Sequence, residues 1–225
     1  DLAQAIVKFH RENEGWVIEE DLASYASAIE APVRMQFRGM DVYTCDAWCQ
    51  GPVMQQMISL LKGYDLDAYD HNSVEYIHLV SEAMKLSMAD RERYYGDPRF
   101  IDVPLDTLLS ETYAEERRLQ IREDEAWPDM PPPGALGSQY GRAAAAAPIS
   151  AGSPPPSGDT SYCCVVDSDG NIFSATPSDV SWESPIIPGT GFCPSSRGSQ
   201  SWAVPGHASA VAPGKRPRLT PNPAI

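Results

Sequence analysis

The sequence has no run of about 18 consecutive apolar residues, the length that a membrane-spanning helix requires. It is also poor in positive charge, with 17 lysines and arginines against 31 aspartates and glutamates. Most of the formal net charge of −14 falls in residues 1–126, which carry 25 acidic and 12 basic side chains. An acidic surface repels nucleic acid and anionic lipid, so we expect no nucleic acid and no membrane among the partners. The charge is interpreted as a solvated helical surface.

Cysteine is scarce and irregularly placed. The five cysteines, at positions 45, 49, 163, 164 and 193, are odd in number, which argues against a simple disulfide framework, and their spacing matches no zinc pattern. Neighbouring residues of a strand point to opposite faces, so Cys163 and Cys164 are interpreted as small core residues. The cysteines leave the redox compartment open, and the localisation with it. We expect no metal ion and no cofactor.

Two further signatures are incomplete or missing. Residues 167–171, DSDGN, begin like a calcium loop, but Ser178 stands where an EF-hand needs its bidentate glutamate, so the segment is interpreted as a turn. The chain opens on Asp1, with neither an initiator methionine nor a signal peptide. We therefore expect a segment whose true beginning lies upstream.

The chain divides into three zones by composition. Helical periodicity and capping residues predict that residues 1–126 are mostly helical, with helices near 2–15, 19–28, 52–62, 73–95 and 110–121 and a hairpin at 33–37 and 42–44. Residues 127–159 are interpreted as a mobile linker, because 127–158 hold eight of the 21 prolines and a five-alanine run. Residues 160–225 begin with a hairpin, 162–166 and 172–176. Its two apolar faces predict a sheet covered on both sides.

The junction between linker and hairpin can carry chemistry. A threonine hydroxyl at Thr160 can attack the carbonyl of Asp159, shift the acyl group from nitrogen to oxygen, and let water release a new N-terminal threonine. The freed α-amine, with an ordinary pKa near 7.7–8.0, can then act as the base for its own hydroxyl. On composition alone, the simpler interpretation is that Thr160 only opens a strand.

Several motifs in a fixed order resemble one family. Residues 159–171, DTSYCCVVDSDGN, resemble the start of the small subunit of gamma-glutamyltransferases. The motifs PGTG at 188–191, RG at 197–198, PGH at 205–207 and APGKRP at 212–217 follow in that family's order. Upstream, GYDL at 63–66, EAMK at 82–85 and DRERYYGDP at 90–98 resemble the end of its large subunit. The resemblance covers nearly the whole chain apart from the linker.

This resemblance implies a fold and a division of the chain. The family is part of the N-terminal-nucleophile hydrolases, and its fold is α+β, a four-layer α/β/β/α sandwich. Residues 1–126 would then be the end of the large subunit, 127–159 the linker that ends at the cleavage site, and 160–225 the start of the small subunit. The arginine that binds the substrate carboxylate and the glycine pair of the oxyanion hole would lie outside this chain.

The resemblance also assigns catalytic roles. Thr160 matches the nucleophile, and cleavage is expected between Asp159 and Thr160. Ser178 matches the hydroxyl residue that steadies the nucleophile, which is usually a threonine. The family's Thr-Thr-His opening is replaced by Ser161 and Tyr162 after the nucleophile, and a family asparagine by Val180. These departures put the matched activity in doubt.

The matched substrate-binding positions also depart from the family. Arg197 and Gln200 fall where an amide and an acidic residue hold the glutamyl α-ammonium. Leu219 and Thr220 fall where a serine pair helps to bind the α-carboxylate. The Arg-Gly pair at 197–198 resembles a subgroup that includes proteins called cephalosporin acylases. A permanently charged guanidinium at Arg197 disfavours a donor with an ammonium group if it points into the pocket. The simpler alternative is that Arg197 turns outward and binds a surface carboxylate.

Three functions follow from these residues. The leading hypothesis is an autoprocessing enzyme that cleaves small-molecule gamma-glutamyl amides, such as glutathione, and passes the acyl group to water or to an amine. The second keeps this machinery but acts on glutaryl-type or other side-chain amides. The third is an inactive homologue that serves as a binding module. In the first two, the large and small subunits of one precursor are each other's partners.

Overall fold

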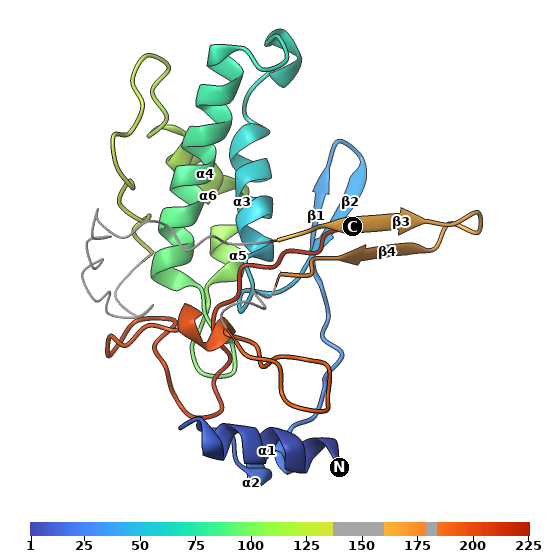
Figure 1. Ribbon diagram of the computed structural model, residues 1–225. Helices are drawn as coiled ribbons and strands as arrows, with labels where there is room; N and C mark the ends of the chain where they lie inside the picture. Colours follow the sequence, from blue (N-terminus) through green and yellow to red (C-terminus); the bar gives the residue numbers. More distant parts are fainter. Residues whose placement is uncertain (137–159, 179–183) are drawn as a thin grey trace.

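The computed structural model describes residues 1–136, 160–178 and 184–225 as a mixture of helices and strands (Figure 1). The α-helices are α1 (Leu2–Glu12), α2 (Glu19–Ser24), α3 (Gly51–Leu61), α4 (Val74–Tyr94), α5 (Leu105–Leu108) and α6 (Glu111–Arg118). Two short 3-10 helices, η1 (Leu66–Ala68) and η2 (Arg197–Gln200), lie in connections. The strands form two hairpins, β1 (Val33–Phe37) with β2 (Met40–Thr44), and β3 (Cys163–Val166) with β4 (Ile172–Ala175).

Local sequence signals set the helix ends. Asp1 and Gln4 form a capping box at the start of α1. The Ser73 and Ser110 hydroxyls accept hydrogen bonds from backbone amides in the first turns of α4 and α6. The predicted helices are confirmed within a few residues, except that α2 ends at Ser24, four residues early. No residue of α2 is buried, so no packing extends this short helix.

The first hairpin gains a third partner from the far end of the chain. Arg38 and Gly39 both have positive φ, as a two-residue turn between antiparallel strands requires. Beside β2, Tyr43 and Ile225 exchange backbone hydrogen bonds of 2.6 and 3.0 Å. The C-terminal residues therefore extend this sheet, next to the base of the second hairpin (Figure 1).

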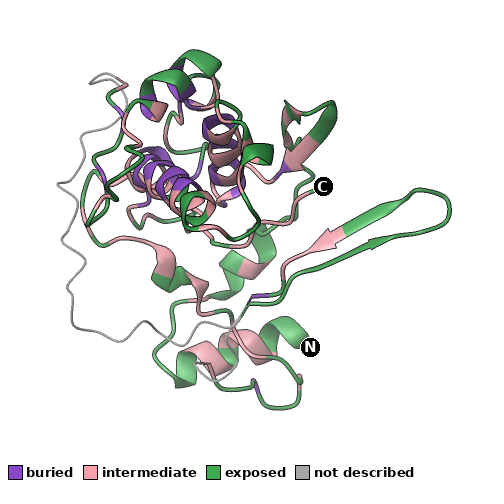
Figure 2. Cartoon of the chain, turned by 90° about the horizontal axis from the view of Figure 1, so that it is seen from above, coloured by how far each residue is buried: buried purple, intermediate pink, exposed green. Residues whose placement is uncertain are grey.

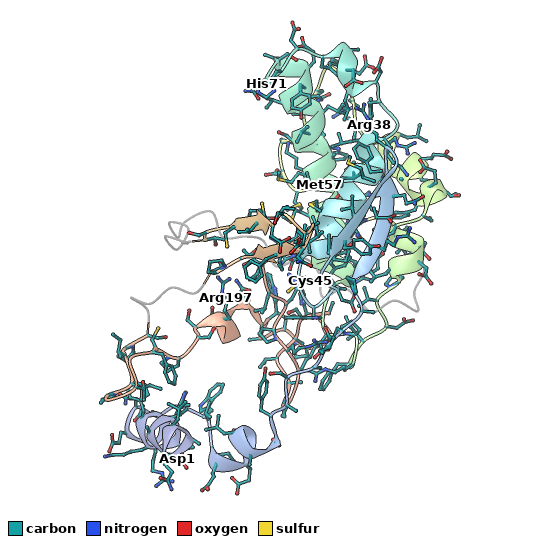
Figure 3. The ribbon with its side chains drawn as sticks, turned by 90° about the vertical axis from the view of Figure 1, so that its right-hand side faces the viewer. Asp1, Arg38, Cys45, Met57, His71 and Arg197 are labelled. Carbon is teal, nitrogen blue, oxygen red and sulfur yellow. The ribbon has the colours of Figure 1, made fainter. Side chains whose placement is uncertain are left out.

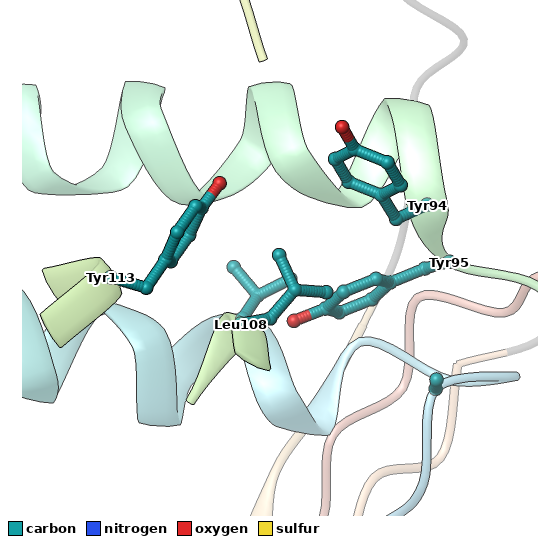
Figure 4. Packing of buried hydrophobic residues seen from close by; sticks show 6 residues of the cluster. Tyr94, Tyr95, Leu108 and Tyr113 are labelled. Carbon is teal, nitrogen blue, oxygen red and sulfur yellow. The ribbon is translucent and has the colours of Figure 1, made fainter. Parts of the chain in front are cut away.

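The hydrophobic core lies among the helices. Figure 2 shows that most buried residues fall on the packed helices, whereas the β3–β4 hairpin is largely exposed. One cluster consists of Ala47, Val53, Tyr94, Tyr95, Leu108 and Tyr113, and a second of Leu60, Ala83 and Leu86. Figure 4 shows the ring of Tyr95 beside Leu108, with the hydroxyl of Tyr113 directed at α4.

The core also buries a charge. Asp90 on α4 is 1% exposed, and its carboxylate lies 3.2 Å from Nη2 of the equally buried Arg117. The same carboxylate accepts hydrogen bonds from Gln56 Nε2 (3.1 Å), the Tyr113 hydroxyl (2.9 Å) and the backbone amide of Gly134 (2.8 Å). Burial raises the pKa of Asp90, and the attraction of Arg117 with these hydrogen bonds acts against the rise. The network ties α3, α4 and α6 together.

The second hairpin corrects one sequence prediction. Its strands and turn form as predicted, and the carboxylate of Asp167 accepts backbone hydrogen bonds from Asp169 (2.9 Å) and Asn171 (2.8 Å), which confirms a turn. All four residues of β3 are exposed, however, so the prediction of a sheet covered on both sides is wrong for this chain. Cys163 and Cys164 are exposed rather than core residues. Each strand pairs only with the other, and within the described residues no layer packs on either face.

The predicted linker begins with a packed segment. Residues 127–136 contain neither helix nor strand. They are nevertheless held on the helices, since Trp127 N donates to Glu82 (3.1 Å) and the Tyr94 hydroxyl donates to Gly134 O (2.5 Å). The remaining linker residues, 137–159, lie outside the described residues. Among the helices that the structure describes, none has the length and apolar character to cross a membrane.

Candidate active site

The side chains of Thr160 and Ser178 meet at the open end of the second hairpin. The amide of Ser161 donates to the carbonyl of Pro177 (3.0 Å), which continues the pairing of β3 and β4 beyond the strands. This pairing brings Thr160 Oγ1 to 2.5 Å from Ser178 Oγ. Thr160 is exposed and Ser178 is buried, so the pair has one accessible hydroxyl and one held in place. Asp159 lies outside the described residues.

A guanidinium reaches the same pair from η2. Arg197 Nη2 donates a hydrogen bond to Ser178 Oγ, and Nη1 donates to Thr220 Oγ1 (2.8 Å). Gln200 Nε2 donates to the same Thr220 hydroxyl (3.2 Å). Figure 3 shows Arg197 on η2, beside the strands of the second hairpin. The structure therefore brings together the five described residues that the sequence nominated, from three separate segments.

Buried contacts from the helical half position Thr220. The amide of Leu219 donates to the carbonyl of Trp48 (2.8 Å). The preceding Arg218 is 3% exposed, and its guanidinium donates to the carbonyl of Arg91 (2.8 Å) and to Glu92 Oε2 (2.5 Å) at the end of α4. Thr220 is thus fixed to the helical core rather than to the hairpin.

A second buried carboxylate holds the segment before Thr220. Asp97 accepts hydrogen bonds from Arg99 Nη2 (2.6 Å), from the amide of Arg216 (2.9 Å) and from Arg216 Nη2 (3.0 Å). Burial alone would raise the pKa of Asp97, but these hydrogen bonds outweigh it and hold the pKa well below its usual range. The guanidinium of Arg216 also lies over the Trp48 ring, 4.4 Å from its centroid.

The arrangement of donors constrains the chemistry of the hydroxyl pair. A guanidinium can only donate, so Ser178 Oγ is the acceptor in its bond with Arg197. A hydroxyl that accepts from a cation is polarised, and its own hydrogen becomes a better donor. If Ser178 directs that hydrogen at Thr160, it stabilises negative charge on the Thr160 oxygen. Such charge develops when a hydroxyl attacks a carbonyl carbon.

Sequence reasoning did not predict the contacts of Tyr162 or the unpaired oxygens near this pair. The Tyr162 hydroxyl lies 3.1 Å from Ser174 Oγ and donates to Ala224 O (3.2 Å), so this residue ties the hairpin to the C-terminal segment. Thr176 Oγ1 and Gln200 Oε1 are buried without a hydrogen-bond partner among the described residues. Two-residue alternation along the strands places Tyr162 and Ser174 on one face, which is the signal that would have paired them.

A separate cleft lies beside β2 and the C-terminal residues. It encloses about 340 Å³ and is lined by residues of β2, of the 45–48 loop, of β4 and of the C-terminal end, among them Cys45 and Ser174. None of the five site residues lines it. The hydrogen-bonded cluster around Thr160, rather than the size of a cavity, therefore identifies the candidate active site.

Comparison with known proteins agrees with the motifs. The family model described as Gamma-glutamyltranspeptidase matches residues 1–225. The chain is 31% identical to the Acylase ACY 1 proenzyme of Pseudomonas sp. (strain SE83), over 96% of this chain and 36% of that protein. It is 32% identical to the Glutathione hydrolase-like YwrD proenzyme of Bacillus subtilis (strain 168), over 100% of this chain and 39% of that protein.

A solved structure supports the same assignment. The cephalosporin acylase from Bacillus halodurans superposes with a TM-score of 0.77 at 28% identity, over 100% of this chain and 37% of that one. The chain thus spans less than two fifths of the length of each of these three relatives. With its whole length matched by the family model, the chain belongs to the gamma-glutamyltranspeptidase family.

Proposed function

We propose that the protein containing this chain is an autoprocessing amidohydrolase whose nucleophile is Thr160. The observation that carries the proposal is the 2.5 Å contact between Thr160 Oγ1 and the buried Ser178 hydroxyl, at the first described residue after the predicted linker. The names of the relatives support it, because both curated proteins are called proenzymes. The three-segment cluster supplies a further argument, since a threonine that merely opens a strand needs no such partners.

The proposed maturation is an acyl shift followed by hydrolysis. Thr160 Oγ attacks the carbonyl carbon of Asp159, and the peptide C–N bond breaks as an ester bond forms. Water then hydrolyses the ester, leaving the carboxylate of Asp159 and a free hydroxyl and α-amine on Thr160. In turnover, this amine takes the hydroxyl proton and returns it to the leaving amine. The acyl-enzyme passes its acyl group to water or to an acceptor amine.

The proposal includes a division of the chain and a fold. Residues 1–126 are the end of the large subunit, 127–159 the linker with the cleavage site at its end, and 160–225 the start of the small subunit. The complete protein adopts the four-layer sandwich, in which further strands and helices cover the hairpin. The exposed strand β3 and the exposed Ile172 and Phe173 of β4 support this fold, because they offer uncovered apolar surface.

The acyl donor is the least constrained part of the function. Gamma-glutamyl amides are the first candidate because of the family. A donor that ends in a carboxylate, such as a glutaryl amide, is the second, and Arg197 favours it. Its guanidinium lies against Ser178 and Thr220, on the side of the nucleophile, where it can pair with a carboxylate and repels an ammonium group.

The mass of the purified full-length protein tests the proposal. Maturation requires two chains, and N-terminal sequencing of the smaller one should read Thr-Ser-Tyr-Cys-Cys, from Thr160. Thr160→Ala should give one uncut chain, while Thr160→Ser should still be cut because it keeps the hydroxyl. An uncut wild-type chain would instead support the inactive binding module. A cut at another bond would overturn the assignment of Thr160.

A further inference from the structure

Two cysteines outside the candidate active site lie on one tight turn. Cys45 and Cys49 are in the connection between β2 and α3, where the amide of Cys49 donates to the carbonyl of Asp46 (2.9 Å) and closes a turn. The turn places the two cysteines close together in one short loop, and the pKa of each thiol depends on the other thiol. Both cysteines are free thiols. Figure 3 labels Cys45 at the base of the first hairpin.

Close packing holds this connection in place. A Cβ atom added to Gly51 would lie 2.1 Å from the carbonyl oxygen of Cys45, so the backbone on the two sides of the turn is in direct contact. Trp48 lies between the two cysteines in the sequence. Its indole donates to Glu30 (2.8 Å) and lies under the Arg216 guanidinium. The two thiols are therefore juxtaposed by a fixed loop rather than by chance contact of mobile side chains.

The two thiols differ in access. Cys45 is half-buried and lines the cleft of about 340 Å³, so a small molecule can reach its sulfur. Cys49 is 3% exposed and does not line the cleft. This is the arrangement of an attacking and a resolving thiol.

Electrostatics assign the same roles. The hydrogen bond from Cys49 lowers the pKa of Cys45 to about 7, although burial and the carboxylates of Glu30 and Asp46 oppose the shift. The hydrogen bond to Cys45 and burial raise the pKa of Cys49, against the opposing charge of Arg216. Of the two thiols, Cys45 is therefore the one that ionises first as the pH rises.

We propose that Cys45 and Cys49 are a reversible oxidation site, in which a hydroperoxide that enters the cleft oxidises Cys45 and Cys49 closes a disulfide. The Cys45 thiolate attacks the distal oxygen of the hydroperoxide, the O–O bond breaks, and an alcohol or water leaves with a sulfenic acid on Cys45. The Cys49 sulfur then attacks that sulfur and expels water. Two thiols are oxidised to one disulfide, and the hydroperoxide is reduced to alcohol and water. A small dithiol reverses the reaction.

The three other cysteines serve as internal controls. Cys163 and Cys164 are exposed but lie side by side on one strand, with their side chains on opposite faces. Cys193 is half-buried in a separate segment. Exposure alone would make Cys163 and Cys164 react first, whereas the proposed site makes the 45–49 pair react first.

The test treats the full-length protein with one equivalent of hydrogen peroxide and maps its peptides by mass spectrometry. The peptide that contains residues 45–49 should lose two hydrogens and regain them with a dithiol. Cys49→Ser should stop at a sulfenic acid that dimedone traps at Cys45. Cys45→Ser should lower the oxidation rate of this peptide at neutral pH by at least about tenfold, because it removes the reactive thiolate.

Two results would overturn the proposal. One is a wild-type peptide that stays reduced while Cys163 or Cys164 is oxidised. The other is a Cys49→Ser protein that gives no trapped sulfenic acid at Cys45. Because Cys49 is buried, Cys49→Ala serves as a second variant if the serine protein fails to fold, and the wild-type map needs no variant. Cleavage at Thr160 is scored separately, so either proposal can fail without the other.

Discussion

The networks around Asp90 and Thr160 use similar groups, a guanidinium with hydroxyls and an amide, in opposite surroundings. Around Asp90 the groups are sealed between α3, α4 and α6, and the carboxylate accepts three hydrogen bonds beside its ion pair with Arg117. Around Thr160 the cluster ends in an exposed hydroxyl and holds two buried oxygens without partners among the described residues. In the sealed network the carboxylate is fully paired, although Arg117 Nε has no partner among the described residues, and such a network contributes stability. An open cluster with unpaired acceptors is suited to a ligand. The two networks should therefore respond differently to substitution.

The largest expected effect is the loss of activity on substitution of the nucleophile itself. Thr160→Ala should abolish cleavage and turnover, a loss on the order of a million-fold for a removed nucleophile. It should leave the free energy of unfolding within about 0.5 kcal/mol of an uncleaved reference, because Thr160 is exposed. The measurements are intact mass and chemical denaturation, with the wild-type precursor isolated before cleavage as the reference. A large loss of stability would place Thr160 in the same class as Asp90.

The reverse is expected for the buried carboxylate. Asp90→Ala should lower the free energy of unfolding by about 3–5 kcal/mol, because it leaves the guanidinium of Arg117 buried without its partner. Asp67→Ala is the matched control, since it removes the carboxylate of an exposed ion pair with Arg38, worth less than about 1 kcal/mol. Denaturant titration of both variants gives the comparison. Equal losses would show that burial does not distinguish the two ion pairs.

Arg197 sharpens the chemical side of the comparison. Two positive charges about 4 Å apart repel by about 4 kcal/mol at an effective dielectric constant of about 20, or nearly a thousandfold in rate. If Arg197 selects the donor, the wild type should prefer glutaryl to gamma-glutamyl anilides, and Arg197→Gln should shift the ratio of kcat/KM toward gamma-glutamyl. Arg197→Lys keeps the charge and should keep the ratio. A wild type that prefers gamma-glutamyl, with a ratio unchanged in Arg197→Gln, would show that Arg197 does not select the donor.

The smallest effect is expected for the pH dependence of the free energy of unfolding that Asp97 contributes. The pKa of Asp97 is lower in the folded protein than in the unfolded chain, so its ionised form is stabilised by folding. That contribution is fully present above pH about 4, the ordinary range of an aspartate, and is lost as the pH falls through the folded value. Unfolding free energies of the wild type and Asp97→Asn, measured from pH 7 downward, should begin to converge below pH about 4. Parallel curves would contradict the assignment.

Local signals in the sequence predicted much of the fold. Ser73 and Ser110 cap helices where their position indicates it, and Arg38 with Gly39 turns the first hairpin. These features depend on a few adjacent residues. The Asp90 network was not predicted, because Gln56 and Gly134 lie 34 and 44 residues away along the chain. No periodic pattern connects groups at such separations.

The candidate site shows the same limit in another form. The family motifs nominated Thr160, Ser178 and Arg197, and the structure places them in contact. The burial of β3 was predicted incorrectly from its apolar residues. Two apolar faces indicate that other layers pack on the sheet, but they do not show that this chain supplies those layers. The chain covers only 36% and 39% of the lengths of the two named relatives, which is consistent with that result.

The contacts that fix Thr220 also bear on what a cut before Thr160 would do. Arg218 with Glu92, Arg216 with Asp97, and Ile225 with Tyr43 all join residues from opposite sides of the proposed cut. These bonds form while the two pieces are one molecule, when each is at a high effective concentration around the other. A cut would leave a heterodimer assembled without any encounter in solution. Its unfolding, unlike that of the precursor, should depend on protein concentration.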